Sequence, residues 1–130
     1  MDKNIAMSYV PRLEKIVLKG VNVKNTGSTL IGTTENGSSR FYPLFAIIEI
    51  ATASIITVVG AASIGTNSSS YNNILAITTL TGLTAVNNIL NLNLAGVVST
   101  SVAPNTDIYL KVTTGFIATT ATADVHLLGY

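Results

Sequence analysis

The two residues best suited to chemistry are Asp124 and His126, near the end of this 130-residue sequence. His126 is the single histidine, and one residue separates it from Asp124. Alternate residues of a strand point to the same face, so the carboxylate could orient the imidazole, or the two side chains could begin a metal site. No motif supplies a third ligand or a nucleophile. We therefore expect both to be polar surface or interface residues.

Other catalytic arrangements have less support in the sequence. Glu49 and Asp107 could serve as a general acid and base only if the fold brought them together, and no sequence feature does so. Cysteine is absent, which excludes a disulfide framework and a thiolate site. We expect no enzyme activity, no cofactor and no metal.

The sequence is poor in charge. Only 10% of the residues are charged and the mean hydropathy is +0.52, whereas about a quarter of a typical soluble domain is charged. Residues 41–130 contain four charged side chains, Glu49, Asp107, Lys111 and Asp124. Because surface charge helps to keep a monomer soluble, we expect much of the exterior to be covered by copies of the chain or by a larger assembly.

The charge is also unevenly distributed. Residues 1–40 hold six bases and three acids, a balance of +3, and residues 41–130 hold one base and three acids, a balance of −2. This asymmetry predicts that the N-terminal part faces a polar or acidic partner. It falls short of the dense basic face that nucleic acid requires, so we expect no nucleic-acid partner.

Residues 43–62 are about long enough to cross a bilayer and carry one charge, Glu49. A carboxylate in the middle of a membrane span is costly, and the Ile, Thr and Val residues favour strands. We expect two strands joined by a turn of small residues, and no membrane partner.

Residues 1–19 lack the continuous apolar core of a signal peptide, so we expect a soluble chain without signal-peptide export.

Alternating apolar and polar residues predict about eight short strands, most clearly in Leu90-Asn91-Leu92-Asn93-Leu94. The expected strands fall at 16–23, 40–50, 55–59, 62–64, 71–77, 90–94, 108–113 and 122–128, and residues 29–31 could add a further short strand. Residues 80–87 suit either a loop or a helical turn. The pattern predicts an all-β fold: residues 15–130 form a two-sheet antiparallel β-sandwich of jelly-roll type, after an extended N-terminal arm at 1–14.

The alternation also predicts which residues of strand 40–50 face the core. They are Tyr42, Leu44, Ala46, Ile48 and Ile50. Residues of the opposite parity, such as Phe41 and Phe45, are then expected to face outward.

Four segments carry a resemblance to known proteins: SSRFYPLFAIIEI, SIGTNSSSYNNIL, TLTGLT and the closing SVAPNTDIYLKVTTGFIATTATADVHLLGY. The resemblance extends over roughly residues 15–130. The segments resemble small virion proteins of tailed bacteriophages, seen as capsid decoration (cement) proteins or as relatives of head-fibre and other trimeric β-sandwich proteins. The resemblance implies a homotrimer, made in the host bacterial cytoplasm, that binds the major capsid protein or a head-fibre protein on the outer capsid surface.

The resemblance and the charge pattern together suggest contact residues. We expect Arg12, Lys15, Lys19 and Lys24 to contact the shell, and Tyr109 and Tyr130 to contact neighbouring subunits. Lysines on a sheet edge also guard against aggregation. The alternative function is a module of a tail or fibre tip that binds a host glycan or receptor through the polar loop at 66–73. A membrane-inserting protein, based on residues 43–62 alone, is a further alternative.

Overall fold

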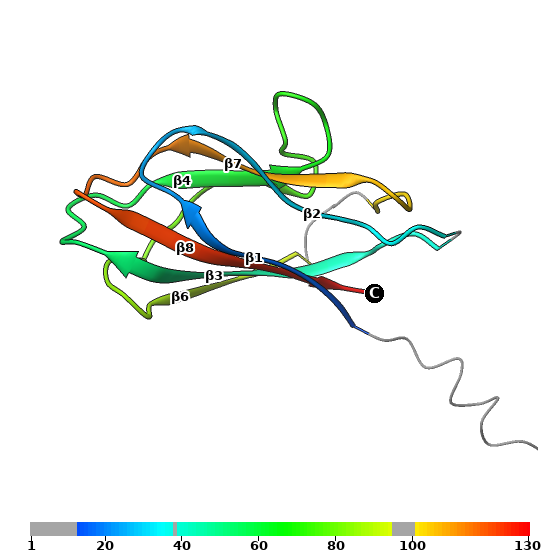
Figure 1. The fold of residues 1–130 in the computed structure, drawn as a ribbon, viewed down its shortest axis with the longest axis horizontal. Coiled ribbons are helices and arrows are strands. Elements are labelled where there is room, and N and C mark those ends of the chain that lie inside the picture. Colours follow the sequence, from blue (N-terminus) through cyan, green and yellow to red (C-terminus); the bar gives the residue numbers. More distant parts are fainter. Residues whose placement is uncertain (1–12, 38, 95–100) are drawn as a thin grey trace, which may run out of the picture.

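The computed structural model describes residues 13–37, 39–94 and 101–130, which form an all-β fold of two stacked antiparallel sheets (Figure 1). The strands are β1 (Glu14–Asn22), β2 (Gly27–Thr33), β3 (Pro43–Ala53), β4 (Ala61–Gly65), β5 (Leu75–Thr79), β6 (Ile89–Asn93), β7 (Asp107–Thr114) and β8 (Ala121–Gly129). Met1–Arg12, most of the expected arm, lie outside the described residues.

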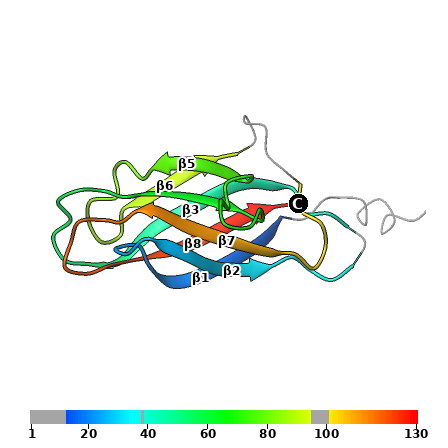
Figure 2. The same cartoon turned by 90° about the horizontal axis from the view of Figure 1, so that it is seen from above.

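Each sheet contains four strands. Sheet A has the order β1-β8-β3-β6, and sheet B has the order β2-β7-β4-β5. This is the strand order of a jelly roll, so the predicted two-sheet antiparallel β-sandwich is confirmed. Seen from above, β1 and β2 lie along one side of the sandwich and β5 and β6 along the other (Figure 2).

The core lies between the two sheets and follows the alternation of the strands. On β8 the residues Ala121, Ala123, Val125 and Leu127 are buried, and the residues between them are half-buried on the outer side. Strand β7 buries Ile108, Leu110 and Val112 in the same way. Burial of these apolar side chains is the main stabilising contribution to a fold of this kind.

The inward face predicted for strand 40–50 is right in its second half and wrong at its start. Ala46, Ile48 and Ile50 are buried as expected, but Tyr42 is 53% exposed and Phe41 is only 3% exposed. Phe41 pairs with Val102 through two backbone hydrogen bonds of 2.8 Å. The register shifts between Pro43 and Phe45, so the parity that holds later in the strand does not apply to Phe41 and Tyr42.

The strand expected at 55–59 is a loop. Strand β3 extends to Ala53, and Ile55 is 85% exposed. The loop is fastened to the connection between β7 and β8, because the Thr57 N–H donates to the Ile117 carbonyl at 2.9 Å and the Ile117 N–H donates to the Val58 carbonyl at 2.9 Å. The β-branched residues at 55–59 therefore belong to a loop held by backbone hydrogen bonds. Val58 and Ile117 form only an isolated bridge, which does not extend into a strand.

The structure also defines the conformation of two segments that the sequence placed differently or left open. Residues 71–74 precede β5 instead of belonging to it, so the strand predicted at 71–77 begins at Leu75. Residues 80–88 form turns that bury Leu80 and Leu83. Within the described parts of the chain, no helix is long and apolar enough to span a membrane, and residues 43–62 hold β3 and the start of β4.

Candidate interaction surfaces

The outer face of sheet A is the side of that sheet that points away from the core. Alternation and register place these residues on it: Lys15, Val17, Lys19, Thr122, Asp124, His126, Leu128, Phe45, Ile47, Glu49, Ile89, Asn91 and Asn93. Val17, Phe45, Ile47 and Leu128 are half-buried. The face is therefore a mixture of apolar and charged side chains.

The two carboxylates of this face are neighbours. Glu49 of β3 is the direct cross-strand partner of Asp124 of β8. Like charges in directly opposite positions of a sheet are destabilising. Asp124 Oδ1 accepts a hydrogen bond of 2.9 Å from the Gly20 N–H, at the bulge where β1 departs from regular pairing and Gly20 has a φ of 71°.

Asp124 and His126 do share one face, as the sequence predicts. His126 lies between Val17 of β1 and Ile47 of β3 in the sheet register. The described residues contain no group of three or more His, Asp or Glu side chains arranged to hold a metal ion. The sequence analysis missed Glu49 as the neighbour of this pair, because its position depends on the pairing of β3 with β8.

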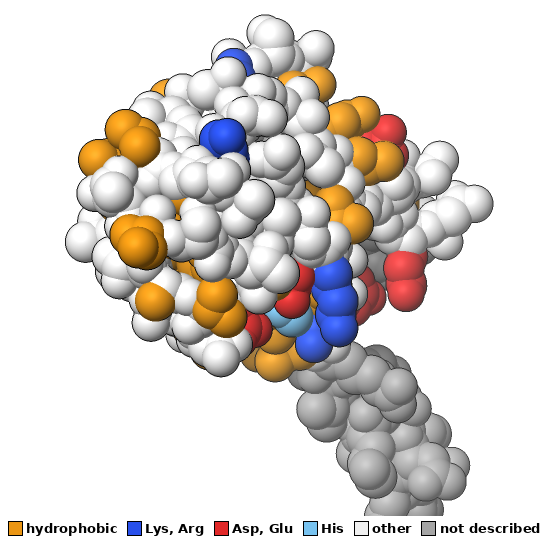
Figure 3. All heavy atoms as spheres, turned by 60° about the vertical axis from the view of Figure 1, so that its left-hand side comes forward, with side chains coloured by type: hydrophobic (Ala, Val, Ile, Leu, Met, Phe, Trp, Pro, Cys, Tyr) orange, Lys and Arg blue, Asp and Glu red, His pale blue; other side chains and the backbone are white. Residues whose placement is uncertain are grey.

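The basic residues predicted to contact a shell lie in different places. Lys15 and Lys19 belong to β1, the edge strand of sheet A, and Lys24 is exposed in the turn that follows β1. Arg12 lies outside the described residues. Figure 3 shows basic side chains beside acidic side chains and the histidine on one side of the molecule. Lys15, Lys19 and Lys24 make no side-chain hydrogen bond or ion pair with any other residue that the structure describes.

The outer face of sheet B is partly covered by the chain itself, through the loop 66–73 between β4 and β5, the green loop above β4 in Figure 1. The Tyr71 ring stacks on the Tyr109 ring with 4.6 Å between centroids. Lys111 Nζ donates to the Ser69 carbonyl at 2.6 Å. Ser63 is completely buried. Tyr109, predicted to contact a neighbouring subunit, thus contacts Tyr71 of its own chain.

Side-chain amides hold this loop in shape. Asn73 Oδ1 accepts from the Thr66 N–H at 2.8 Å, and Asn73 Nδ2 donates to Thr66 Oγ1 at 2.9 Å. Asn67 Oδ1 accepts from the Asn72 N–H at 2.9 Å. The amide groups of this polar loop are therefore engaged within the loop.

Tyr130, the other residue predicted at a subunit interface, is 45% exposed. Its N–H donates to the Tyr42 carbonyl at 3.0 Å, and the Tyr42 N–H donates to the Tyr130 carbonyl at 2.8 Å. Two exposed tyrosines thus meet at one end of sheet A. A phenol offers apolar area and a hydrogen-bonding group, which suits a protein contact.

The opposite end of the sandwich is apolar. We define the apolar loop end by the exposed residues Ile55, Val58, Val86 and Ile117. The Phe116 N–H donates to the Val23 carbonyl at 3.0 Å, which brings the turn that holds Lys24 next to this end. Figure 3 turns that end toward the viewer and shows hydrophobic side chains separated by uncharged polar surface.

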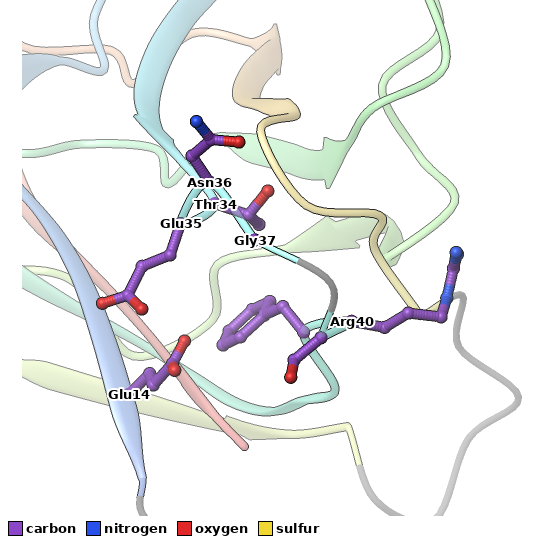
Figure 4. Close-up of a pocket in the computed structure, with 8 residues that line it drawn as sticks. Glu14, Thr34, Glu35, Asn36, Gly37 and Arg40 are labelled. Carbon is purple, nitrogen blue, oxygen red and sulfur yellow. The ribbon is translucent and has the colours of Figure 1, made fainter.

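A small hollow lies beside the start of β1 (Figure 4). Its volume is about 120 Å³, and its lining residues are Glu14, Thr34, Glu35, Asn36, Gly37, Ser39, Arg40 and Phe41. The Arg40 side chain points away from the two carboxylates, and its Nε donates to Ser101 Oγ at 2.9 Å. Ligand pockets usually exceed about 300 Å³, so this hollow is too small for a typical ligand.

No protein-family model and no curated protein sequence matches this chain. A solved structure with a similar fold is a chain of the acidic stable capsid structure of Helicobacter pylori bacteriophage KHP30. The TM-score is 0.56 at 13% sequence identity, and the alignment covers 91% of this chain and 85% of that chain. At this identity the likeness establishes a shared fold, and it extends over nearly the whole of both chains.

Proposed function

We propose that this chain is a structural protein of a bacteriophage virion, one that binds the outside of the capsid and stabilises the shell as a decoration or cement protein. The observation that carries the proposal is the likeness to a chain of a phage capsid structure across 91% of the sequence. Proteins with a jelly-roll fold have many different functions. Support for a shell-binding function must therefore also come from the surface of this chain.

The surface supports contact over catalysis. Its charged residues are few, and the outer face of sheet A presents half-buried apolar side chains without cover from the described chain. The described residues contain no cluster suited to hold a metal. The homotrimer expected from the resemblance belongs to this proposal, as do contacts with the major capsid protein or a head-fibre protein.

Shell contact fits the apolar loop end best. Ile55 and Ile117 are 85% and 58% exposed, and backbone hydrogen bonds hold their loops in place. Lys24 adds a base beside them. Arg12 stays a proposed shell contact apart from this end, because it precedes Glu14, which pairs with Gly129 at the opposite end of sheet A. A protein that binds the assembled shell but not its dispersed subunits stabilises the shell by mass action.

The test is binding to purified capsids that lack this protein. We expect the wild-type chain to bind and to raise the temperature at which the shells rupture. The Ile55→Asp variant should bind at least about tenfold more weakly, because a carboxylate would be buried at the contact. Ile77→Asp is the matched control, since Ile77 is also exposed but lies on β5, away from the loop end.

Unchanged binding of Ile55→Asp would place the contact elsewhere, and loss of binding in both variants would mean that the contact is not confined to the loop end. Failure of the wild-type chain to bind any capsid would contradict the shell function. The remaining alternative is a tail- or fibre-tip module that binds a host glycan or receptor. One observation favours it: a groove of about 310 Å³ between β5 and β6, lined in part by Asn72, Leu75 and Leu92. Binding of the chain to isolated host surface glycan would support that alternative.

A further inference from the structure

The charges on the outer face of sheet A are separated by strand. Lys15 and Lys19 lie on the edge strand β1. Glu49 and Asp124 lie on the two central strands. The other edge, β6, presents neutral amides such as Asn91. One face therefore contains a basic strip and, next to it, an acidic pair.

Among the described residues, no ion pair neutralises the acidic pair. Glu49 has no side-chain hydrogen bond or ion pair among the described residues, and Asp124 has only the bond from the Gly20 N–H. Lys15 and Lys19 have no side-chain hydrogen bond or ion pair within the described ranges either. Two opposed carboxylates repel each other, so a cation brought to this position from outside would stabilise the face.

Apolar side chains surround these charges. Ile47 lies next to Glu49 along β3, and Val17 lies between the two lysines along β1. Both are half-buried, as are Phe45 and Leu128. A partner on this face would remove apolar area from water and would exclude solvent from the charge pairs, which strengthens them.

We propose that the outer face of sheet A is a contact between copies of this chain, in which Lys15 and Lys19 of one copy lie against Glu49 and Asp124 of another. A second copy supplies the required pattern because each copy has both the basic strip and the acidic pair. The contact can close as a twofold dimer or as a head-to-tail ring, since in both the same two surface regions meet.

This inference goes beyond the proposed function because it names the surface through which copies meet, and it does not depend on shell binding. It assigns Lys15 and Lys19 to contact between copies, and leaves Arg12 and Lys24 for contact with the shell. The contact between copies forms in solution without capsids, whereas shell binding requires them. The two ideas can therefore fail separately.

The test uses charge reversal in the full-length chain, with the oligomeric mass measured by light scattering over a range of protein concentrations. Lys15→Glu with Lys19→Glu makes the strip acidic. Glu49→Lys with Asp124→Asn makes the acidic pair basic and retains an Oδ1 acceptor for the Gly20 N–H. We expect each double variant to raise the dissociation constant by about 100-fold, because like charges then meet across the contact.

Combining all four substitutions in one chain provides the decisive comparison. The strip is then acidic and the former acidic pair is basic, so the attraction is restored with reversed signs. We expect the combined variant to regain an oligomeric mass close to that of the wild-type chain. Lys24→Glu is the matched control, because it reverses a charge outside the face and should leave the mass unchanged.

Circular dichroism and thermal unfolding check that each variant folds. The contact would be established if both double variants are dissociated and the chain with all four substitutions is folded and has the wild-type mass. A failure to fold in the double variants would not be repaired by adding further substitutions. The proposal is overturned if the wild-type chain is monomeric at all concentrations, if the folded double variants keep the wild-type mass, or if the combined variant stays dissociated.

Discussion

The outer faces of the two sheets differ in what covers them. Sheet B is covered near its centre by the loop 66–73, which stacks Tyr71 on Tyr109 and accepts a hydrogen bond from Lys111. Sheet A has no such cover from the described chain, and its Glu49 is without a side-chain partner. Both sheets have four strands and the same antiparallel pairing, so the difference comes from a single connecting loop.

This difference indicates where a partner can reach the sheet directly. On sheet B the aromatic and basic side chains already have partners, so a contact there would have to displace the loop first. On sheet A no loop of the described chain covers the apolar side chains, and Lys15, Lys19 and Glu49 have no side-chain hydrogen bond or ion pair with another described residue, so a partner can contact them directly. Sheet A, whose outer face the described chain leaves uncovered, is therefore the better candidate for a contact surface.

The largest expected effect comes from forcing the loop off sheet B. A side chain at Gly65 would clash with the Asn73 amide and with the backbone of Asn72 and Tyr71. We expect Gly65→Val to lower the free energy of unfolding by about 2–3 kcal/mol, the usual cost of overpacking, as measured by urea denaturation. Ser28→Val, on the exposed β2 strand of the same sheet, is the control and should change it by less than about 0.5 kcal/mol.

A Gly65→Val protein as stable as the wild-type chain would show that the loop is not held against the sheet. The oligomeric mass gives a second readout. Because the proposed contact between copies lies on sheet A, the mass should not change in this variant.

A smaller effect should follow from removing the ring stack. Tyr71→Ala deletes the contact with Tyr109, and we expect the free energy of unfolding to fall by about 1–2 kcal/mol. Tyr71→Phe keeps the ring and should differ from wild type by less than about 0.5 kcal/mol. Equal losses in the two variants would mean that the hydroxyl, and not the stacking, stabilises the loop.

The smallest effect is expected on the uncovered face. Asp124→Ala removes the acceptor of the Gly20 N–H and also relieves the repulsion from Glu49. These two changes oppose each other, so we expect a net loss of only about 0.5–1 kcal/mol, measured at low protein concentration. Asp124→Asn keeps the acceptor and removes the charge, and should be neutral or slightly stabilising.

A loss of more than about 2 kcal/mol in Asp124→Ala would contradict this account of the face. It would mean that the hydrogen bond to Gly20 dominates and that Glu49 exerts little repulsion. The Asn variant separates the two contributions, because only the charge differs from the wild-type side chain.

The sequence predicted the fold class because alternation is a local property. Leu90 and Leu92 face inward and Asn91 and Asn93 face outward, as the pattern indicates. The prediction failed where long-range pairing decides the outcome. Residues 55–59 have the composition of a strand but are fastened to the connection between β7 and β8, and no local pattern indicates that partner.

The candidate contacts were predictable only in part, for the same reason. The position of Asp124 and His126 on one face follows from their spacing. The opposition of Glu49 to Asp124 depends on the register of β3 with β8, and the stacking of Tyr109 on Tyr71 depends on a loop that folds back over its own sheet. The sequence contains the residues of both arrangements but gives no signal of their partners.

The most direct measurement is the rate at which single cysteines react on the two outer faces, since the natural sequence contains none. Ile47→Cys reports on the centre of sheet A, and Ser28→Cys reports on sheet B. Between about 1 and 100 µM protein, we predict that labelling of Ile47→Cys by a small thiol reagent slows by about tenfold or more as copies associate, while labelling of Ser28→Cys stays constant. Equal rates at all concentrations in Ile47→Cys, or slowing only in Ser28→Cys, would contradict the claim that sheet A is the contact surface.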